Sequence, residues 1–147
     1  MSIIITITNQ KGGVGKTTTA CSLMDGLRHR GARVLGVDLD PQGSLGFCLG
    51  LDIENCATIY DVLKGSRSIR EVITPSECGD ILPSNILLSA AELEFNRPGR
   101  EFLLKTCLSE VSEDYDYIII DTPPALNVLT VNAYVAADGL IIPMAPE

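Results

Sequence analysis

The chain has 147 residues, of which 46% are hydrophobic and 20% are charged, and its formal net charge is −8. This length suits one domain with a real hydrophobic core, and the composition is that of a folded rather than a disordered protein. The acidic balance argues against broad electrostatic attraction to nucleic acid or anionic lipid.

Apolar runs alternate along the chain with segments of helical periodicity. The pattern predicts strands at 3–8, 33–38, 80–82, 117–120 and 139–143. It predicts helices at 17–30, 59–64, 69–72, 87–95, 102–111 and 126–136. Strands that alternate with helices indicate an α/β fold with a mainly parallel, doubly wound sheet flanked by helices. We expect residues 1–147 to form a single nucleotide-binding domain.

A glycine-rich segment directly follows the first predicted strand: Lys11-Gly12-Gly13-Val14-Gly15-Lys16-Thr17-Thr18. Its glycines let backbone N–H groups converge on phosphate oxygens, and the helix N-terminus adds unpaired donors and a positive dipole end. Lys16 would reach the β- and γ-phosphates of a triphosphate, and Thr17 would hold Mg²⁺. The usual P-loop has a glycine where this chain has Gln10, and it does not require Lys11. A turn that only joins a strand to a helix rarely needs three glycines and two lysines.

Acidic residues follow two of the predicted strands. Asp38 and Asp40 end the second strand, and Asp121 ends a later one. Open α/β sheets place their chemistry at the carboxyl ends of strands. Asp121 is therefore predicted to bind Mg²⁺ through water across from Thr17, with Asp38 supporting the same shell. Asp40 is predicted to orient the water that attacks the γ-phosphate. Taken singly, each aspartate could equally end a strand or cap a helix.

Other classes of site find less support in the sequence. The cysteines are odd in number and never spaced as Cys-x-x-Cys, which favours neither a disulfide framework nor a zinc site: Cys21, Cys48, Cys56, Cys78 and Cys107. No apolar stretch approaches the roughly 20 residues that cross a bilayer, and no basic region precedes the first apolar run. We therefore expect a cytoplasmic protein that does not bind membranes.

Three segments in this order resemble the nucleotide motifs of the deviant Walker A (ParA/MinD) P-loop ATPases. They are Lys11 to Thr18, Asp38-Leu39-Asp40-Pro41-Gln42-Gly43 and Ile120-Asp121-Thr122-Pro123-Pro124. Leu82-Pro83-Ser84-Asn85, followed by Leu88 and Ala91-Glu92, resembles the ParA/Soj partition branch more than the MinD branch. The resemblance runs through the whole chain.

The resemblance implies a role for each matched position. Lys11 is similar to the signature lysine that reaches the partner's phosphates in an ATP-bound homodimer, and Gly12 to the position where the two subunits approach most closely. Gly13 to Thr18 match nucleotide ligands, with Lys11, Lys16 and Asp40 as catalytic residues and Thr17, Asp38 and Asp121 at the metal. The implied function is slow, Mg²⁺-dependent ATP hydrolysis that switches a dimer during plasmid or chromosome segregation. A ParB-like adaptor would stimulate hydrolysis, and a full-length relative would bind non-specific DNA at the nucleoid.

This chain is shorter than the members of the family that it resembles. Members of the family commonly run well beyond about 200 residues, and they exceed this chain by roughly the length of a further domain. The resemblance thus implies a fold that is incomplete at its C-terminus, or a reduced member that completes itself by association. The adenine contacts and DNA-binding residues of relatives have no counterpart among these residues.

Alternative functions stay open at this stage. One is a MinD-like ATPase, and another is a metabolic relative such as an iron–sulfur carrier, the nitrogenase iron protein or an amide-forming ligase. The cysteine pattern disfavours the iron–sulfur proteins because no cysteine lies near Asp121. A third is a module that binds nucleotide without turnover.

Overall fold

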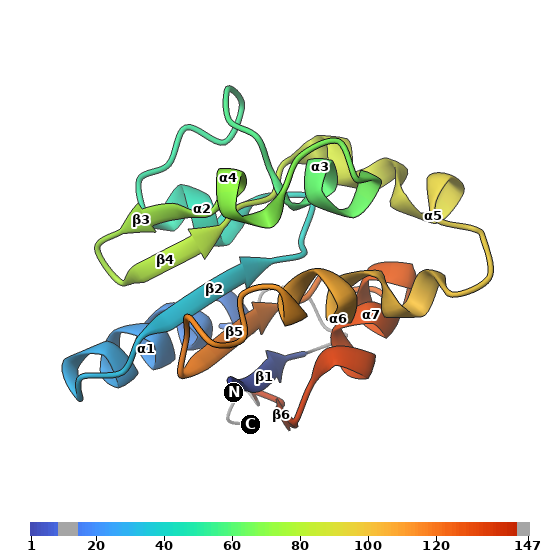
Figure 1. Cartoon of the computed structure of the whole chain (residues 1–147). Coiled ribbons are helices and arrows are strands. Elements are labelled where there is room, and N and C mark those ends of the chain that lie inside the picture. Colours follow the sequence, from blue (N-terminus) through green and yellow to red (C-terminus); the bar gives the residue numbers. More distant parts are fainter. Residues whose placement is uncertain (9–14, 144–147) are drawn as a thin grey trace, which may run out of the picture.

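A computed structural model of the protein describes residues 1–8 and 15–143. Its centre is a six-stranded sheet in the order β3-β4-β2-β5-β1-β6 (Figure 1). The strands are β1 (Ile3–Ile7), β2 (Val34–Asp38), β3 (Thr74–Ser76), β4 (Gly79–Leu82), β5 (Tyr117–Asp121) and β6 (Gly139–Ile141). Neighbouring strands are parallel except for β3, which runs antiparallel to β4 at one edge. The predicted mainly parallel sheet is confirmed.

Helices cover both faces of the sheet. They are α1 (Lys16–His29), α2 (Ser44–Cys48), α3 (Ile59–Lys64), α4 (Ile69–Val72), α5 (Ala91–Glu94), α6 (Leu103–Ser109) and α7 (Val128–Ala136), with 3₁₀ helices η1 (Ile86–Ala90) and η2 (Arg100–Phe102). Ile119 of β5 packs with α1 and α2 on one face. Ile118 and Ile120 pack with α3, α4, α6 and α7 on the other. Burial on both faces explains why β5 is apolar throughout.

Two short helices begin and end where the sequence predicts because local signals fix them. Thr58 and Asp61 form a capping box at the start of α3, and Ser68 and Glu71 form one at the start of α4. Gly65, in the left-handed conformation, ends α3. Here local chemistry alone determines the structure.

The later helices differ from the prediction. Residues 87–95 were expected as one helix, but they form most of η1 followed by the single turn α5. The segment 102–111 begins as η2, and α6 starts only at Leu103. A distant side chain sets that start, because Asn132 Oδ1 accepts a hydrogen bond from the Leu104 N–H (3.0 Å). The short elements α2 and β3 were not predicted.

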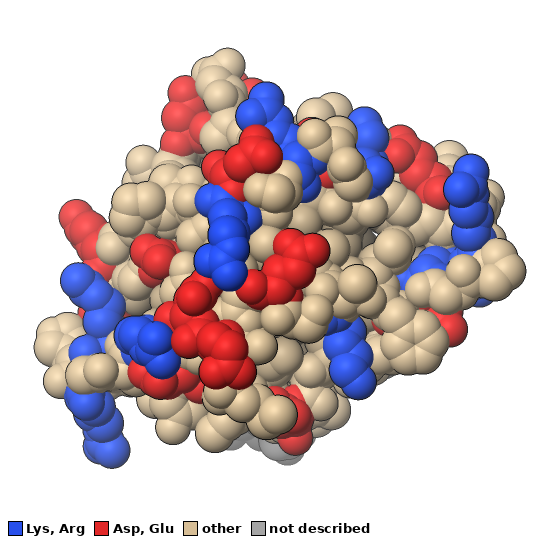
Figure 2. All heavy atoms as spheres, viewed as in Figure 1, with Lys and Arg blue, Asp and Glu red and all other residues tan. Residues whose placement is uncertain are grey.

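The surface carries charges of both signs. On the face seen in Figure 2, acidic and basic side chains are interspersed, without a continuous basic area among the described residues. At the sheet edge, Leu140 of β6 is 53% exposed and Ile142, just beyond it, is 62% exposed. The described end of the sheet at β6 therefore exposes apolar side chains. Within the described ranges, none of the helices combines the length and hydrophobicity needed to span a membrane.

Candidate nucleotide site

The predicted site residues converge at the carboxyl edge of the central strands. Asp38 ends β2 and Asp121 ends β5, and the two residues are register partners in the parallel ladder. Helix α1 starts beside them with Lys16 and Thr17. Its N-cap, Gly15, has a φ of +76°, a left-handed conformation that favours glycine, and it offers no side-chain oxygen to the first N–H groups of the helix. The edge therefore combines a helix N-terminus with carboxylates.

Lys16 is the cation at the centre of this edge. Its Nζ donates a hydrogen bond to Asp121 Oδ1 at 2.7 Å and lies 3.9 Å from Asp40 Oδ2. The Thr17 hydroxyl donates to the other Asp121 oxygen, Oδ2, at 3.0 Å. The Lys16 side chain is 9% exposed and the Asp121 side chain is completely buried. The sequence prediction that these four residues share one site agrees with their positions.

Asp121 carries an electrostatic penalty despite its ion pair. Burial raises its pKa, and the attraction of Lys16 and the hydrogen bonds from Lys16 and Thr17 offset only part of that effect. The nearby Asp40 carboxylate raises the pKa further. The site is therefore short of positive charge.

Asp38 has a different environment from the one expected of a direct metal ligand. Its Oδ1 accepts a hydrogen bond from the Asp40 N–H (3.0 Å), and its Oδ2 accepts one from the Leu45 N–H (3.2 Å). Burial, reinforced by the Asp121 carboxylate, raises the pKa of Asp38 to about 8. Both oxygens thus contact the loop that carries Asp40.

The Asp40 loop also depends on a residue that was not assigned a role from the sequence. The Ser84 hydroxyl, completely buried after β4, donates a hydrogen bond to the Asp40 carbonyl at 2.8 Å. Asp40 Oδ1 in turn accepts from the Gln42 N–H at 3.0 Å. Ser84 belongs to the Leu82 to Asn85 segment that resembled the partition branch, but neither spacing nor residue type pointed to this contact.

The structure does not place every predicted residue in this site. Lys11, Gly12, Gly13 and Val14 fall outside the described residues. Thr18 is exposed on α1. Within the described ranges no three His, Cys, Asp or Glu side chains are grouped so that they could hold a metal ion. The cysteines all carry free thiols.

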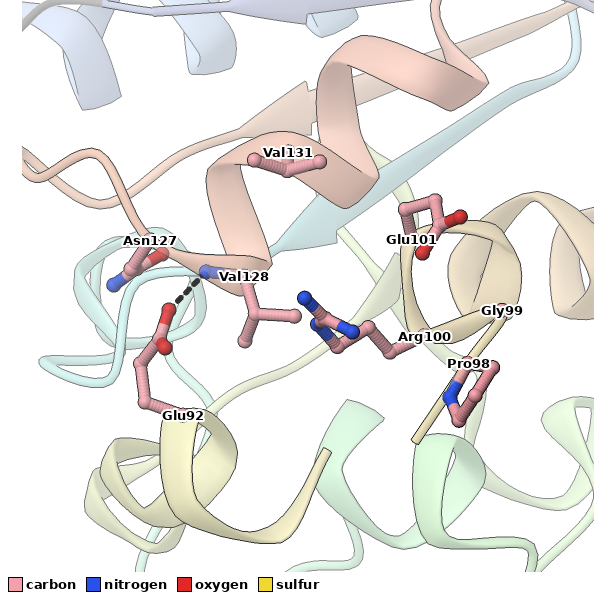
Figure 3. A pocket seen from close by; sticks show the side chains of 8 residues that line it. All are labelled: Glu92, Pro98, Gly99, Arg100, Glu101, Asn127, Val128 and Val131. Atoms are coloured by element: carbon pink, nitrogen blue, oxygen red, sulfur yellow. Dashed lines mark hydrogen bonds between the residues drawn. The ribbon is translucent and has the colours of Figure 1, made fainter. Parts of the chain in front are cut away.

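A separate pocket of about 630 Å³ lies between α5, η2 and α7 (Figure 3). Its lining residues are Glu92, Pro98, Gly99, Arg100, Glu101, Asn127, Val128 and Val131. The Glu92 carboxylate accepts a hydrogen bond from the Val128 N–H, and the Asn127 side chain accepts from two further N–H groups of α7. The first N–H groups of α7 therefore have side-chain acceptors, whereas α1 begins without a side-chain cap.

The sheet order, the flanking helices and the motif between β1 and α1 define a P-loop NTPase-like α/β protein. A family model described as an AAA domain (AAA_31) matches residues 2–147. The chain belongs to this family, as a ParA/Soj-type member of the deviant Walker A ATPases.

The similarity to known proteins covers nearly the whole chain. The chain is 47% identical over 148 residues to the chromosome partitioning protein ParA of Myxococcus xanthus, and this match covers 98% of the chain and 52% of that protein. It is 46% identical over 153 residues to the sporulation initiation inhibitor protein Soj of Bacillus subtilis, covering 100% of the chain and 60% of Soj. The chain thus spans between half and two thirds of the length of these relatives.

A solved structure shows the same similarity. Cobyrinic acid a,c-diamide synthase from Mycobacterium smegmatis, with bound ADP and magnesium, matches with a TM-score of 0.95 and 43% sequence identity. The match covers 98% of this chain and 60% of that one.

Proposed function

We propose that this chain is the nucleotide-binding part of a partition ATPase, which binds ATP with Mg²⁺ and hydrolyses it slowly. The observation that carries the proposal is the contact network of Lys16 with Asp121 and Asp40. A lysine at a helix N-terminus, a Walker-B-like aspartate and a further acid are the groups that phosphoryl transfer requires. Residues 1–147 then act as one nucleotide-binding domain.

The side chains divide the work by their chemistry. Lys16 binds the β- and γ-phosphates and neutralises the charge that spreads over the γ-oxygens. Thr17 and Asp121 hold Mg²⁺, which when bound supplies further positive charge at the phosphates. Asp38 supports this shell through its bonds to the Asp40 loop. Asp40 accepts a hydrogen bond from the attacking water and orients it.

The donor set suits Mg²⁺. This ion prefers oxygen ligands, retains several waters and is usually held by one or two carboxylates together with substrate phosphates. Thr17 and Asp121 offer a hydroxyl and a carboxylate whose oxygens are 3.0 Å apart. The two residues therefore suit an ion that arrives with the nucleotide.

The dimer switch rests on the resemblance. We propose that Lys11 reaches the partner's phosphates in the ATP-bound homodimer, that Gly12 permits the close approach of the subunits, and that Gly13, Val14, Gly15 and Thr18 complete the phosphate loop. A ParB-like adaptor stimulates hydrolysis. A full-length relative would bind non-specific DNA, in the cytoplasm at the nucleoid, through residues that have no counterpart among these 147. The cargo is a plasmid or a chromosome.

An amide-forming ligase is the second candidate, favoured by the similarity to the cobyrinic acid a,c-diamide synthase structure. That similarity lies in the nucleotide-binding portion, because 40% of the matched chain has no counterpart here. It therefore supports the nucleotide site equally under both functions. Phosphate release from ATP without any acceptor substrate distinguishes partition-type hydrolysis from ligation.

Two measurements test the proposal. Equilibrium titration with ATP and Mg²⁺ should show binding by the parent chain and its loss in Lys16→Ala, with the exposed Lys105→Ala on α6 as a matched control. Single-turnover hydrolysis should fall by about 100-fold in Asp40→Ala, while ATP affinity stays within about threefold. Equal ATP affinity in Lys16→Ala would refute the nucleotide site. An unchanged hydrolysis rate in Asp40→Ala would refute its catalytic role.

A further inference from the structure

The backbone of Asp40 is held from two sides by buried side chains. Its N–H donates to Asp38 Oδ1 at 3.0 Å, and its carbonyl accepts from Ser84 Oγ at 2.8 Å. Asp38 and Ser84 are both completely buried. They lie at the ends of β2 and β4, which are neighbouring parallel strands. The core of the sheet therefore fixes the peptide groups on both sides of the Asp40 Cα.

Contacts farther along the loop support the same geometry. The second oxygen of Asp38 accepts the Leu45 N–H at 3.2 Å, which ties the first turn of α2 to the same carboxylate. Gly43 has a φ of +68°, and a Cβ there would lie 2.8 Å from the Ser84 carbonyl oxygen. Only glycine allows the loop to approach Ser84 this closely.

The Asp40 side chain is oriented by this backbone. Oδ1 accepts the Gln42 N–H at 3.0 Å, which closes a short turn. Oδ2 lies on the side of Lys16, 3.9 Å from Nζ. A shift of the Asp40 backbone would move Oδ2 relative to the lysine that binds the phosphates.

We propose that Ser84 and Asp38 are positioning residues for ATP hydrolysis, which hold the Asp40 backbone so that Oδ2 meets the attacking water. The inference rests on the role proposed for Asp40. It assigns to Ser84 a part in turnover but none in nucleotide binding. Small misplacements of a catalytic group lower rates strongly, by up to about 100-fold per ångström.

Ser84→Ala tests the hydrogen bond with little change in volume. Its single-turnover rate constant should fall about tenfold, with ATP affinity within about twofold of the parent. Ser84→Cys keeps the branching of the side chain, with a somewhat larger atom, but offers only a weak donor, so its rate should fall as in Ser84→Ala. A parental rate in Ser84→Cys but not in Ser84→Ala would assign the effect to packing and overturn the proposal.

Ser2→Ala is the matched control. Ser2 is also buried, at the end of β1 remote from the candidate site, and its one hydroxyl proton lies within reach of two carbonyl oxygens, those of Ser112 (2.7 Å) and Tyr115 (2.6 Å). Ser2→Ala should lower the unfolding midpoint as much as Ser84→Ala does, yet leave the hydrolysis rate within about twofold of the parent. Equal rate losses in both variants would overturn the proposal.

A second readout does not depend on turnover. Amide hydrogen exchange at Asp40 and Gly43 in the nucleotide-free chain should accelerate about tenfold in Ser84→Ala and Asp38→Asn, but not in Ser2→Ala. Unchanged exchange would overturn the inference even where the parent hydrolyses ATP. If the parent does not hydrolyse ATP, the proposed function fails, and exchange alone decides whether Ser84 and Asp38 hold the loop.

Discussion

Replacing Lys16 by methionine removes the one cation described among three buried carboxylates while keeping most of the apolar stem. Lys16 Nζ lies 2.7 Å from Asp121 and 3.9 Å from Asp40. Asp38 is the register partner of Asp121 on the adjacent strand. In Lys16→Met, the Asp121 and Asp40 carboxylates lose their nearby cation, while Asp38, whose pKa is raised to about 8, holds its proton at pH 7.

The structure predicts unequal losses for the two partners of this ion pair. Removing one partner of a buried pair destabilises a protein by about 3–5 kcal/mol. We expect this range for Lys16→Met. For Asp121→Asn we expect a change within about 1 kcal/mol, because burial raises the pKa of Asp121, so that its ionised form already opposes folding. Lys16 also keeps Asp40 as a neighbour in that variant.

Urea unfolding of the nucleotide-free chain at pH 7 measures both losses, with the exposed Lys105→Met as a control expected within about 0.5 kcal/mol. In an Asp121→Asn background, Lys16→Met should destabilise less. At pH 5 its effect should also shrink, since carboxyl groups with raised pKa values take up protons more readily in the folded chain. Equal losses for Lys16→Met and Asp121→Asn, or a loss independent of pH, would refute this reasoning.

Three further predictions concern single side chains. Because the pKa of Asp38 is raised to about 8, the folded chain keeps a proton that the unfolded chain loses near pH 4. The contribution of this proton to the free energy of unfolding is complete below pH 4 and disappears as the pH rises to 8. Between pH 5 and pH 9 the free energy of unfolding should therefore fall by up to a few kcal/mol more in the parent than in Asp38→Asn, at roughly 1.4 kcal/mol per pKa unit. Urea midpoints that change with pH in parallel for the two proteins would contradict this prediction. Asn132→Leu should lose about 2–4 kcal/mol in urea unfolding, because the buried amide accepts from the Leu104 N–H and donates to two carbonyls; a loss below about 1 kcal/mol would argue against these bonds. Glu92→Ala removes the acceptor of the Val128 N–H, but Asn127 still caps α7. Stability in thermal unfolding should therefore fall by only about 0.5–1 kcal/mol, and a larger loss would mean that Glu92 is the main cap.

The sequence predicted the parts of this fold that neighbouring residues determine. The apolar run of β5 and the capping boxes of α3 and α4 are local signals of this kind. The meeting of Asp38 with Asp121 followed from one general property of parallel sheets, that the carboxyl ends of strands share an edge. Residue type and strand position were enough to predict that these residues would lie together.

Contacts between distant segments could not be predicted in this way. Asn132 sets the start of α6 from 28 residues away, and Ser84 contacts the Asp40 carbonyl across 44 residues. Serine and asparagine are common in loops and at helix ends, so their presence does not identify a partner. Their roles depend on the sheet register, which brings β4 beside β2.

The acidic edge of the sheet is better explained by function than by stability. A chain selected for stability alone would not bury Asp38 and Asp121 opposite each other with one lysine, because burial makes the ionised form of each unfavourable. Groups with such perturbed pKa values gather where chemistry requires them. A bound Mg²⁺ would bring the positive charge that this edge lacks, and the phosphates would give Lys16 a partner other than Asp121. Under the proposed function, the same imbalance that destabilises the nucleotide-free chain would favour binding of a nucleotide together with its metal.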